Sequence, residues 1–348
     1  MSKWRPFPIV AAMEKEQSAF GLPFRVTRHW LSLAAEQLDA CTRDARGVPC
    51  DPILAQALPS DAESHILPWE LTDPLGEASH RQAPRLVRQY RSRLLVRTTG
   101  QCFMFCRHCF RRSLLPEETA FLDDSTMASI ADMLRTHPEL REVLLSGGDP
   151  LTAPAGRLEQ LLHTVRSASE TVLIRLCTRA PIVLPSIVDD QLLAILEHAR
   201  PLHMVLQINH PLELHPDFLS RAERLLRSGI PLHSQTVLLR GINDNVDVLT
   251  SLFSELVKAG IHPYYLFQGD LAAGTSHFRV PLSRGLLLYD ELRRELSGLE
   301  LPRYAVDAPG GGGKIYLPEG VVRRDGDQWI LRTPSGSLCE YPEEPEQY

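Results

Sequence analysis

Short apolar runs alternate with longer stretches of helical spacing from about residue 93 onward. Six runs, rich in β-branched and large apolar residues, predict buried strands at 94–96, 143–145, 172–176, 204–208, 234–238 and 264–267. Between them, apolar residues recur every three or four positions, as in amphipathic helices, at 126–134, 158–165, 189–198, 218–226 and 248–257. Strict alternation of strand and helix predicts an α/β fold, a parallel sheet covered by helices. Six units rather than eight indicate a partial, open (β/α)6 barrel of the TIM type.

The two ends of the chain follow other patterns. The first ninety residues are rich in proline and charge, and a helical N-terminal extension is predicted there. The apolar residues with helical spacing in it are Trp30, Leu31, Leu33, Ala34 and Leu38. Near the C-terminus, Asp325 and Gly326 separate two apolar runs, which predicts a β-hairpin. We therefore expect an extension at 1–90, the barrel at 91–307, and a tail at 308–348 that holds a glycine-rich loop and the hairpin.

Composition narrows the class of protein. The 348 residues are 43% hydrophobic and 23% charged, which is typical of a globular protein with a sizeable core. A net charge of -6 argues against nucleic acid as a partner. No run of 18 apolar residues predicts a membrane span, and the N-terminus lacks the apolar segment of a secretory signal. We expect a cytoplasmic protein.

Three of the seven cysteines crowd into one loop directly after the first predicted strand. Cys102, Cys106 and Cys109 have CxxxCxxC spacing, which favours a metal site in a reducing compartment over a disulfide. A [4Fe-4S] cluster normally takes four thiolates, so three ligands would leave one iron open to bind another molecule. A zinc site completed by His108 and a cluster used only for electron transfer are the alternatives. The other four cysteines are expected to be small buried hydrophobes.

This cysteine loop resembles that of the radical S-adenosylmethionine (SAM) enzymes. There, SAM binds the open iron through its amino and carboxylate groups, and the reduced cluster releases a 5'-deoxyadenosyl radical from it. A second strand-end loop, one βα unit later, supports the resemblance, because a matching Gly-Gly-acid stretch in those enzymes holds the SAM amino group. Its residues here are Ser146, Gly147, Gly148 and Asp149.

A lysine follows four consecutive glycines near the end of the predicted barrel, in Asp307-Ala308-Pro309-Gly310-Gly311-Gly312-Gly313-Lys314. The stretch does not match a phosphate-binding P-loop, because Lys314 is followed by Ile315 rather than Ser or Thr. A lysine on a very flexible loop suits a Schiff base with pyridoxal 5'-phosphate (PLP), since it must move when an amino substrate displaces it.

Four motifs in order, CRHC, SGGDPL, QTVLLRGIND and DAPGGGGK, resemble the lysine 2,3-aminomutase family over about 85–317. The resemblance implies a radical SAM barrel with three cofactors: a [4Fe-4S] cluster, SAM, and PLP on Lys314. It further implies that Arg111 binds the substrate carboxylate, while Asp270 and Asp307 receive the substrate's side-chain ammonium. Gln235 would contact SAM, and Arg93 and Tyr90 would lie near the PLP phosphate and ring.

By this resemblance the protein moves the α-amino group of L-lysine to the β-carbon, using an external one-electron reductant. Two carboxylates around one ammonium argue against the related glutamate 2,3-aminomutase. Arginine or ornithine as substrate, and a cluster protein without turnover, stay open as alternatives. Because the family associates, a homo-oligomer is also left open.

The chain departs from the family pattern at three points. Gln207 stands where the family often has a histidine that contacts SAM. Only Cys339 remains of the additional C-terminal cysteines, so we expect no structural zinc. The length approaches that of shorter relatives that make (R)-β-lysine for elongation factor P, although these do not share so complete a DAPGGGGK loop. That role is therefore left open too.

Overall fold

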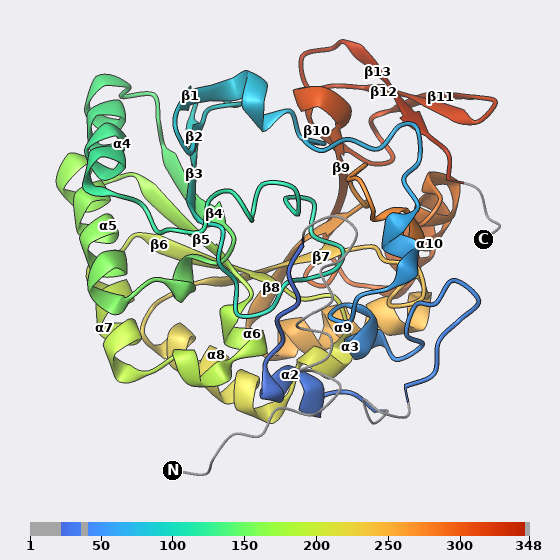
Figure 1. Cartoon of the computed structure of the whole chain (residues 1–348), viewed down its shortest axis with the longest axis horizontal. Coiled ribbons are helices and arrows are strands. Elements are labelled where there is room, and N and C mark those ends of the chain that lie inside the picture. Colours follow the sequence, from blue (N-terminus) through green and yellow to red (C-terminus); the bar gives the residue numbers. More distant parts are fainter. Residues whose placement is uncertain (1–21, 36–40, 345–348) are drawn as a thin grey trace.

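The computed structural model describes residues 22–35 and 41–344 (Figure 1). Its centre is a sheet of ten strands that lie in the order β1 to β10. Seven consecutive strands in it are parallel: β3 (Arg93–Thr99), β4 (Glu142–Gly147), β5 (Leu173–Thr178), β6 (Leu202–Gln207), β7 (Leu232–Val237), β8 (Ile261–Phe267) and β9 (Arg303–Ala308). The six predicted strands are confirmed, and β9 is a seventh that the pattern did not predict.

Six long helices connect the parallel strands and surround the curved sheet on its outer side (Figure 1). They are α4 (Asp124–Thr136), α5 (Ala155–Ala168), α7 (Asp190–His198), α8 (Pro216–Arg227), α9 (Val246–Lys258) and α10 (Leu282–Glu295). In α5 the buried residues are Leu158, Leu161, Leu162 and Val165, which have the predicted helical spacing. Burying each such side chain stabilises the fold by about 1.5–3 kcal/mol. The predicted partial (β/α)6 barrel is confirmed, with α10 and β9 added to it.

Shorter helices lie in the loops between these elements. They are α6 (Ala180–Val183) and the 3-10 helices η4 (Pro150–Thr152), η5 (Pro185–Ile187), η6 (Pro211–Glu213), η7 (Ser276–Phe278) and η8 (Pro309–Gly311). None of the helices in the described ranges is both long and apolar enough to cross a membrane.

Antiparallel strands form the two edges of the sheet. β1 (Arg81–Ala83) and β2 (Leu86–Val87) precede β3, while β10 (Gly313–Tyr316) pairs with β9. The turn between β9 and β10 packs against the segment before β1, where the Gly310 amide donates to the Pro74 carbonyl at 3.2 Å. Gly76 makes this approach feasible, because it has φ +61° and a Cβ there would lie 2.5 Å from the Gly310 carbonyl carbon.

The described part of the N-terminal extension, 22–35 and 41–90, is only partly helical. Its helices are α2 (Arg28–Ser32), α3 (Pro52–Ala55), η2 (Asp61–Ser64) and η3 (Glu77–His80). The predicted apolar face is only partly on a helix, because α2 ends at Ser32. Leu38 of that face lies outside the described residues. Trp30 is fully buried, and its indole N–H donates to the Ile53 carbonyl at 3.0 Å, so α2 and α3 pack together.

The C-terminal tail is a three-stranded antiparallel sheet of β11 (Val321–Asp325), β12 (Gln328–Arg332) and β13 (Leu338–Pro342). The predicted hairpin is confirmed as β11–β12, with Gly326 and Asp327 in its turn. The third strand was not predicted. β13 anchors the tail to the barrel, because the Tyr341 hydroxyl donates to the Gly269 carbonyl at 2.9 Å. The tail thus supports the loop that follows β8.

Candidate active site

One cavity of about 340 Å³ opens at the mouth of the barrel. Its volume is in the range of small-molecule sites. Every residue predicted for the site lines it: Tyr90, Arg93, Cys102, Cys106, Cys109, Arg111, Ser146, Gly147, Gly148, Asp149, Gln235, Asp270, Asp307 and Lys314. The cysteine loop and Lys314 therefore face a common space, which the sequence could only suggest.

The cysteine loop is held in place by the N-terminal extension. The Phe105 amide donates to the Arg25 carbonyl at 3.1 Å, and the Arg107 amide donates to the Gln56 carbonyl at 2.9 Å. Burial, and then the neighbouring Cys106 thiol, raises the pKa of Cys109 to about 11. Burial likewise raises the pKa of Cys102, so Cys102 and Cys109 favour the protonated state until a bound metal replaces the proton, since metal binding requires thiolates.

The spacing of the thiols favours a cluster over a single zinc ion. Around one tetrahedral zinc, with Zn–S bonds of about 2.3 Å, ligand sulfurs would lie roughly 4 Å apart. Among the described residues, only one group of three potential metal-ligand atoms lies within 4.8 Å of one another, and it consists of His29, His215 and Asp217 rather than the cysteines. His108 instead places its Nε2 3.2 Å from the Asn209 side-chain nitrogen. The three cysteines are therefore spread more widely than one ion needs.

The Gly-Gly stretch at the end of β4 packs directly against the start of the cysteine loop. Gly147 has φ +112°, and a Cβ on Gly148 would lie 2.3 Å from the Gln101 carbonyl oxygen. The Asp149 carboxylate accepts hydrogen bonds from the Thr178 hydroxyl at 2.7 Å and from the Arg179 amide at 2.9 Å. Burial nevertheless raises the pKa of Asp149 above its ordinary value. Asp149 thus ties β4 to the end of β5, and a role toward SAM stays a prediction.

Lys314 lies on β10, directly opposite Asp307 on β9. Its Nζ is 2.8 Å from Asp307 Oδ2 and 4.0 Å from the centre of the Phe267 ring. Its backbone amide donates to the Tyr90 hydroxyl at 2.8 Å. The expectation that Lys314 lies in a loop is wrong, because the lysine belongs to strand β10 and the glycines before it form a turn. Only its side chain needs to move.

A second carboxylate lies beside this ion pair. Burial, and then the proximity of Asp307, raises the pKa of Asp270 to about 7. The loop that carries Asp270 is fixed by the tail through Tyr341 and by Arg279, whose Nε donates to Glu344 Oε1 at 2.5 Å. Nearby cations, of which Lys314 has the largest effect, lower the pKa of Asp270 again but do not cancel this rise.

Arg111 lines the cavity with its guanidinium already engaged. Its Nη2 is 2.6 Å from Glu77 Oε1, and its Nη1 donates to the Ser146 hydroxyl at 3.0 Å. Glu77 is buried in η3 and also pairs with Arg97 at 3.4 Å. Sequence reasoning missed Glu77, because no local pattern distinguishes one acid in a loop-rich extension.

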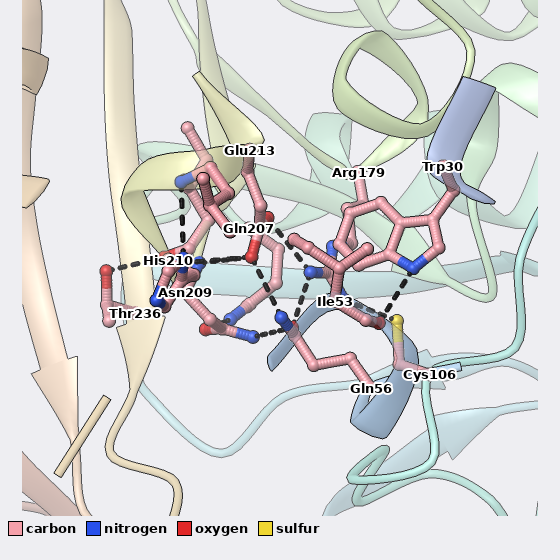
Figure 2. Close-up of polar contacts among 12 residues, drawn as sticks. Trp30, Ile53, Gln56, Cys106, Arg179, Gln207, Asn209, His210, Glu213 and Thr236 are labelled. Carbon is pink, nitrogen blue, oxygen red and sulfur yellow. Dashed lines mark hydrogen bonds and ion pairs between the residues drawn. The ribbon is translucent and has the colours of Figure 1, made fainter. Parts of the chain in front are cut away.

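The remaining predicted residues lie around the cavity. Arg93 stands at the start of β3, stacks over the Tyr90 ring at 4.8 Å, and lies 3.7 Å from Glu142 Oε2. Burial, and then Asp307, raises the pKa of Tyr90. Gln235 is on β7, where it pairs in register with Gln207 of β6. The Gln207 side chain donates to Asn209 Oδ1 at 3.0 Å and so belongs to a buried polar network (Figure 2).

The chain matches two family models. One, described as lysine-2,3-aminomutase, covers residues 289–348, and one described as a 4Fe-4S single cluster domain covers residues 91–180. These ranges contain Lys314 and the three cysteines, respectively.

Curated relatives match most of the chain. It is 39% identical to a putative L-lysine 2,3-aminomutase of Treponema pallidum, over 86% of this chain and 88% of that protein. It is 36% identical to the L-lysine 2,3-aminomutase of Bacillus subtilis, over 94% of this chain and 67% of that protein. It is also 34% identical to the glutamate 2,3-aminomutase of Clostridioides difficile, over 85% of this chain and 70% of that protein. With the cysteine loop and Lys314 facing one cavity, these similarities show that the chain belongs to the lysine 2,3-aminomutase family.

Proposed function

We propose that this protein is an isomerase that moves the α-amino group of L-lysine to the β-carbon. The observation that carries the proposal is the shared cavity, which is lined by the three cysteines and by Lys314, Asp307 and Asp270. Related proteins of this family are named for both lysine and glutamate. The charged residues that line the cavity must therefore determine whether lysine or glutamate is the substrate.

The residues present fit the three cofactors of the family. Cys102, Cys106 and Cys109 would hold the [4Fe-4S] cluster, with Ser146, Gly147, Gly148, Asp149 and Gln235 near SAM. Lys314 would hold PLP, with Tyr90 and Arg93 beside it. The chemistry that these groups supply when bound is a hydrogen-abstracting radical, from SAM and the cluster, and a carbonyl that carries the migrating nitrogen, from PLP.

The acidic pair favours a substrate with a cationic side chain. Lys314 Nζ now lies beside Asp307, in the place of a substrate ammonium. Once Nζ bonds to PLP, Asp307 and Asp270 lose this cation, and the ammonium of a lysine side chain would replace it. A buried charge without a partner is strongly destabilising, so the pair favours a cation and repels the carboxylate of glutamate.

Arg111 would bind the substrate carboxylate at the other end. Its guanidinium is held by Glu77 and its Nη1 is directed to Ser146 at the cavity wall. The distance between Arg111 and the acidic pair would then select the length of the side chain. Lysine is the proposed substrate, with arginine and ornithine as the competing cations.

The protein's own residues also exclude water from the reaction. The cavity walls carry Leu144, Val205, Val237, Tyr265 and Phe267 as well as the polar groups. An apolar lining keeps water away from a reactive carbon centre and strengthens the ion pairs inside. We further propose that an external reductant supplies one electron. We also propose a cytoplasmic location, because all seven cysteines are free thiols.

The test is product analysis with the reconstituted protein. It would be loaded with iron, sulfide and PLP without oxygen, reduced with dithionite, and given SAM with lysine, arginine, ornithine or glutamate separately. We expect a β-amino acid from lysine, identified by mass spectrometry after derivatisation. A β-amino product from glutamate but not from lysine would overturn the proposal, as would intact cofactors with no product from any of the four.

A further inference from the structure

Arg179 connects the cysteine loop to a buried polar network that no sequence motif indicated (Figure 2). It follows the end of β5 and is only 7% exposed. Its Nη1 donates to Cys106 Sγ at 2.9 Å, across the mouth of the barrel. An arginine is always protonated in proteins, so this hydrogen bond places a permanent positive charge on a cluster ligand.

The guanidinium is fixed from its other side. Its Nη2 donates to Glu213 Oε2 at 2.9 Å and to Gln56 Oε1 at 2.7 Å. Glu213 and Gln56 are fully buried, and the Trp30 ring lies 4.6 Å from the Arg179 guanidinium carbon. These contacts orient the guanidinium so that Nη1 points at the sulfur.

The same network also holds the cysteine loop. Gln56 donates through Nε2 to Glu213 Oε1 at 3.1 Å, and its backbone carbonyl accepts from the Arg107 amide at 2.9 Å. Asn209 donates to Gln56 Oε1 at 2.9 Å (Figure 2). The residues around Cys106 thus come from α2, the residue after α3, the residue after β5 and the segment after β6 that includes η6. The contacts of Trp30 and Gln56 with Arg179 give the N-terminal extension a role at the site.

The ion pair with Glu213 uses only one nitrogen of the guanidinium. Arg179 balances the charge of Glu213, yet that ion pair needs only Nη2 and leaves Nη1 for the sulfur. In a buried environment of low dielectric, a charge this close to a ligand is poorly screened. Hydrogen bonds to ligand sulfurs and nearby charge are two of the factors that set the potential of an iron–sulfur cluster.

We infer that Arg179 is a positioning residue that raises the reduction potential of the cluster through its charged hydrogen bond to the Cys106 thiolate. The inference rests on the proposed function, because it requires the cluster on the three cysteines. Reduction moves one electron from the donor to the cluster with no bond made or broken. It adds negative charge at the sulfurs, and the Arg179 cation stabilises that charge.

The test compares cluster potentials in the absence of SAM and lysine. The double variant Arg179→Gln/Glu213→Gln removes both charges of the pair, so that no buried charge is left alone. We expect its equilibrium constant for reduction to fall about tenfold, which is a lower midpoint potential by about 59 mV for one electron. The potential would be read from the electron paramagnetic resonance signal during titration with dithionite.

A control removes another arginine–glutamate pair, in which Arg97 is buried and Glu118 is partly exposed. In Arg97→Gln/Glu118→Gln, a guanidinium that lies 2.8 Å from Glu118 is lost, while Glu77 keeps Arg111 as its partner. We expect its midpoint to stay with that of the unaltered protein. An equal shift in both double variants, or no shift in the Arg179 variant at full iron content, would overturn the inference.

A milder variant covers the case in which the double variant does not fold. Arg179→Lys keeps the cation but loses the fork that bonds Cys106 and Glu213 together. Its midpoint should lie below that of the unaltered protein, and an unchanged midpoint would again overturn the inference. These potentials need no turnover, so a failure to make β-lysine would count against the proposed function and leave this comparison intact.

Discussion

Lys314 Nζ lies 2.8 Å from Asp307 Oδ2, and the two residues face each other directly across the β9–β10 ladder. The lysine that would bind PLP thus begins paired with a carboxylate proposed to bind the substrate. If Lys314 binds PLP as proposed, Asp307 loses this cation and becomes available to the substrate ammonium.

Lys314→Arg is expected to separate these two roles. A guanidinium keeps a cation beside Asp307, so the fold should persist, but it cannot bond covalently to the PLP aldehyde. We expect loss of the visible absorption that PLP gives after gel filtration, and product formation at background. Lys258→Arg, in an exposed pair with Glu255, is the control. A PLP band that survives in Lys314→Arg would show that the lysine assignment is wrong.

Lysine binding should weaken as the pH falls through about 7. Burial and the neighbouring Asp307 raise the pKa of Asp270 to about 7, so that below this pH Asp270 binds a proton. The proton and the substrate ammonium compete for the same carboxylate. The dissociation constant for lysine should therefore rise by up to about tenfold for each pH unit below the pKa of Asp270.

The measurement is equilibrium binding of labelled lysine to the PLP-loaded protein without SAM. Asp270→Asn removes the titrating group. The affinity of this variant for lysine should be weaker than that of the unaltered protein above pH 7, and it should change much less between about pH 8 and about pH 6. If both proteins show the same pH profile, Asp270 does not bind the ammonium.

Replacing one cysteine of the loop should abolish the cluster. In Cys106→Ala only two sulfurs of the set remain, and we expect iron, sulfide and the broad visible absorption to be lost after anaerobic reconstitution. Cys339→Ala, which changes a half-buried thiol on β13, should keep full iron and sulfide content. Stoichiometric zinc without sulfide in the unaltered protein would contradict the cluster assignment.

Gly76→Ala should destabilise the protein and loosen its hold on PLP. The new Cβ would lie 2.5 Å from the Gly310 carbonyl carbon, at a φ of +61° that costs about 1–3 kcal/mol for other residues. The turn that leads to Lys314 would have to shift. Gly156→Ala is the matched control, because its Cβ meets nothing within 4 Å and α5 favours alanine by up to about 1 kcal/mol.

Denaturant unfolding of the two glycine variants, without cofactors, measures the first effect. A PLP titration followed by absorbance measures the second. If the midpoint of Gly76→Ala equals that of Gly156→Ala, the packing of this turn does not support the Lys314 strand.

The parts of the fold that follow from local periodicity could be predicted. The leucines of α5 and the apolar strand at 143–145 show their period within one element, and burial of that face needs no knowledge of distant residues. β9 escaped prediction because the apolar pattern of Arg303–Ala308 is broken by charge at Asp307. Asp307 is also a residue proposed to bind the substrate, so the proposed site residue weakened the structural signal.

The amino-acid sequence by itself determined the alternation of strands and helices, the three closely spaced thiols and the lysine after four glycines. These are properties of neighbours in the chain, where spacing alone decides which groups meet. Only the tertiary structure decided that Arg179 reaches Cys106, that Glu77 holds Arg111, and that the lysine lies on a strand. Such contacts join residues from separate elements, and their energy depends on burial and orientation that arise when the sheet curves and the extension packs over its mouth.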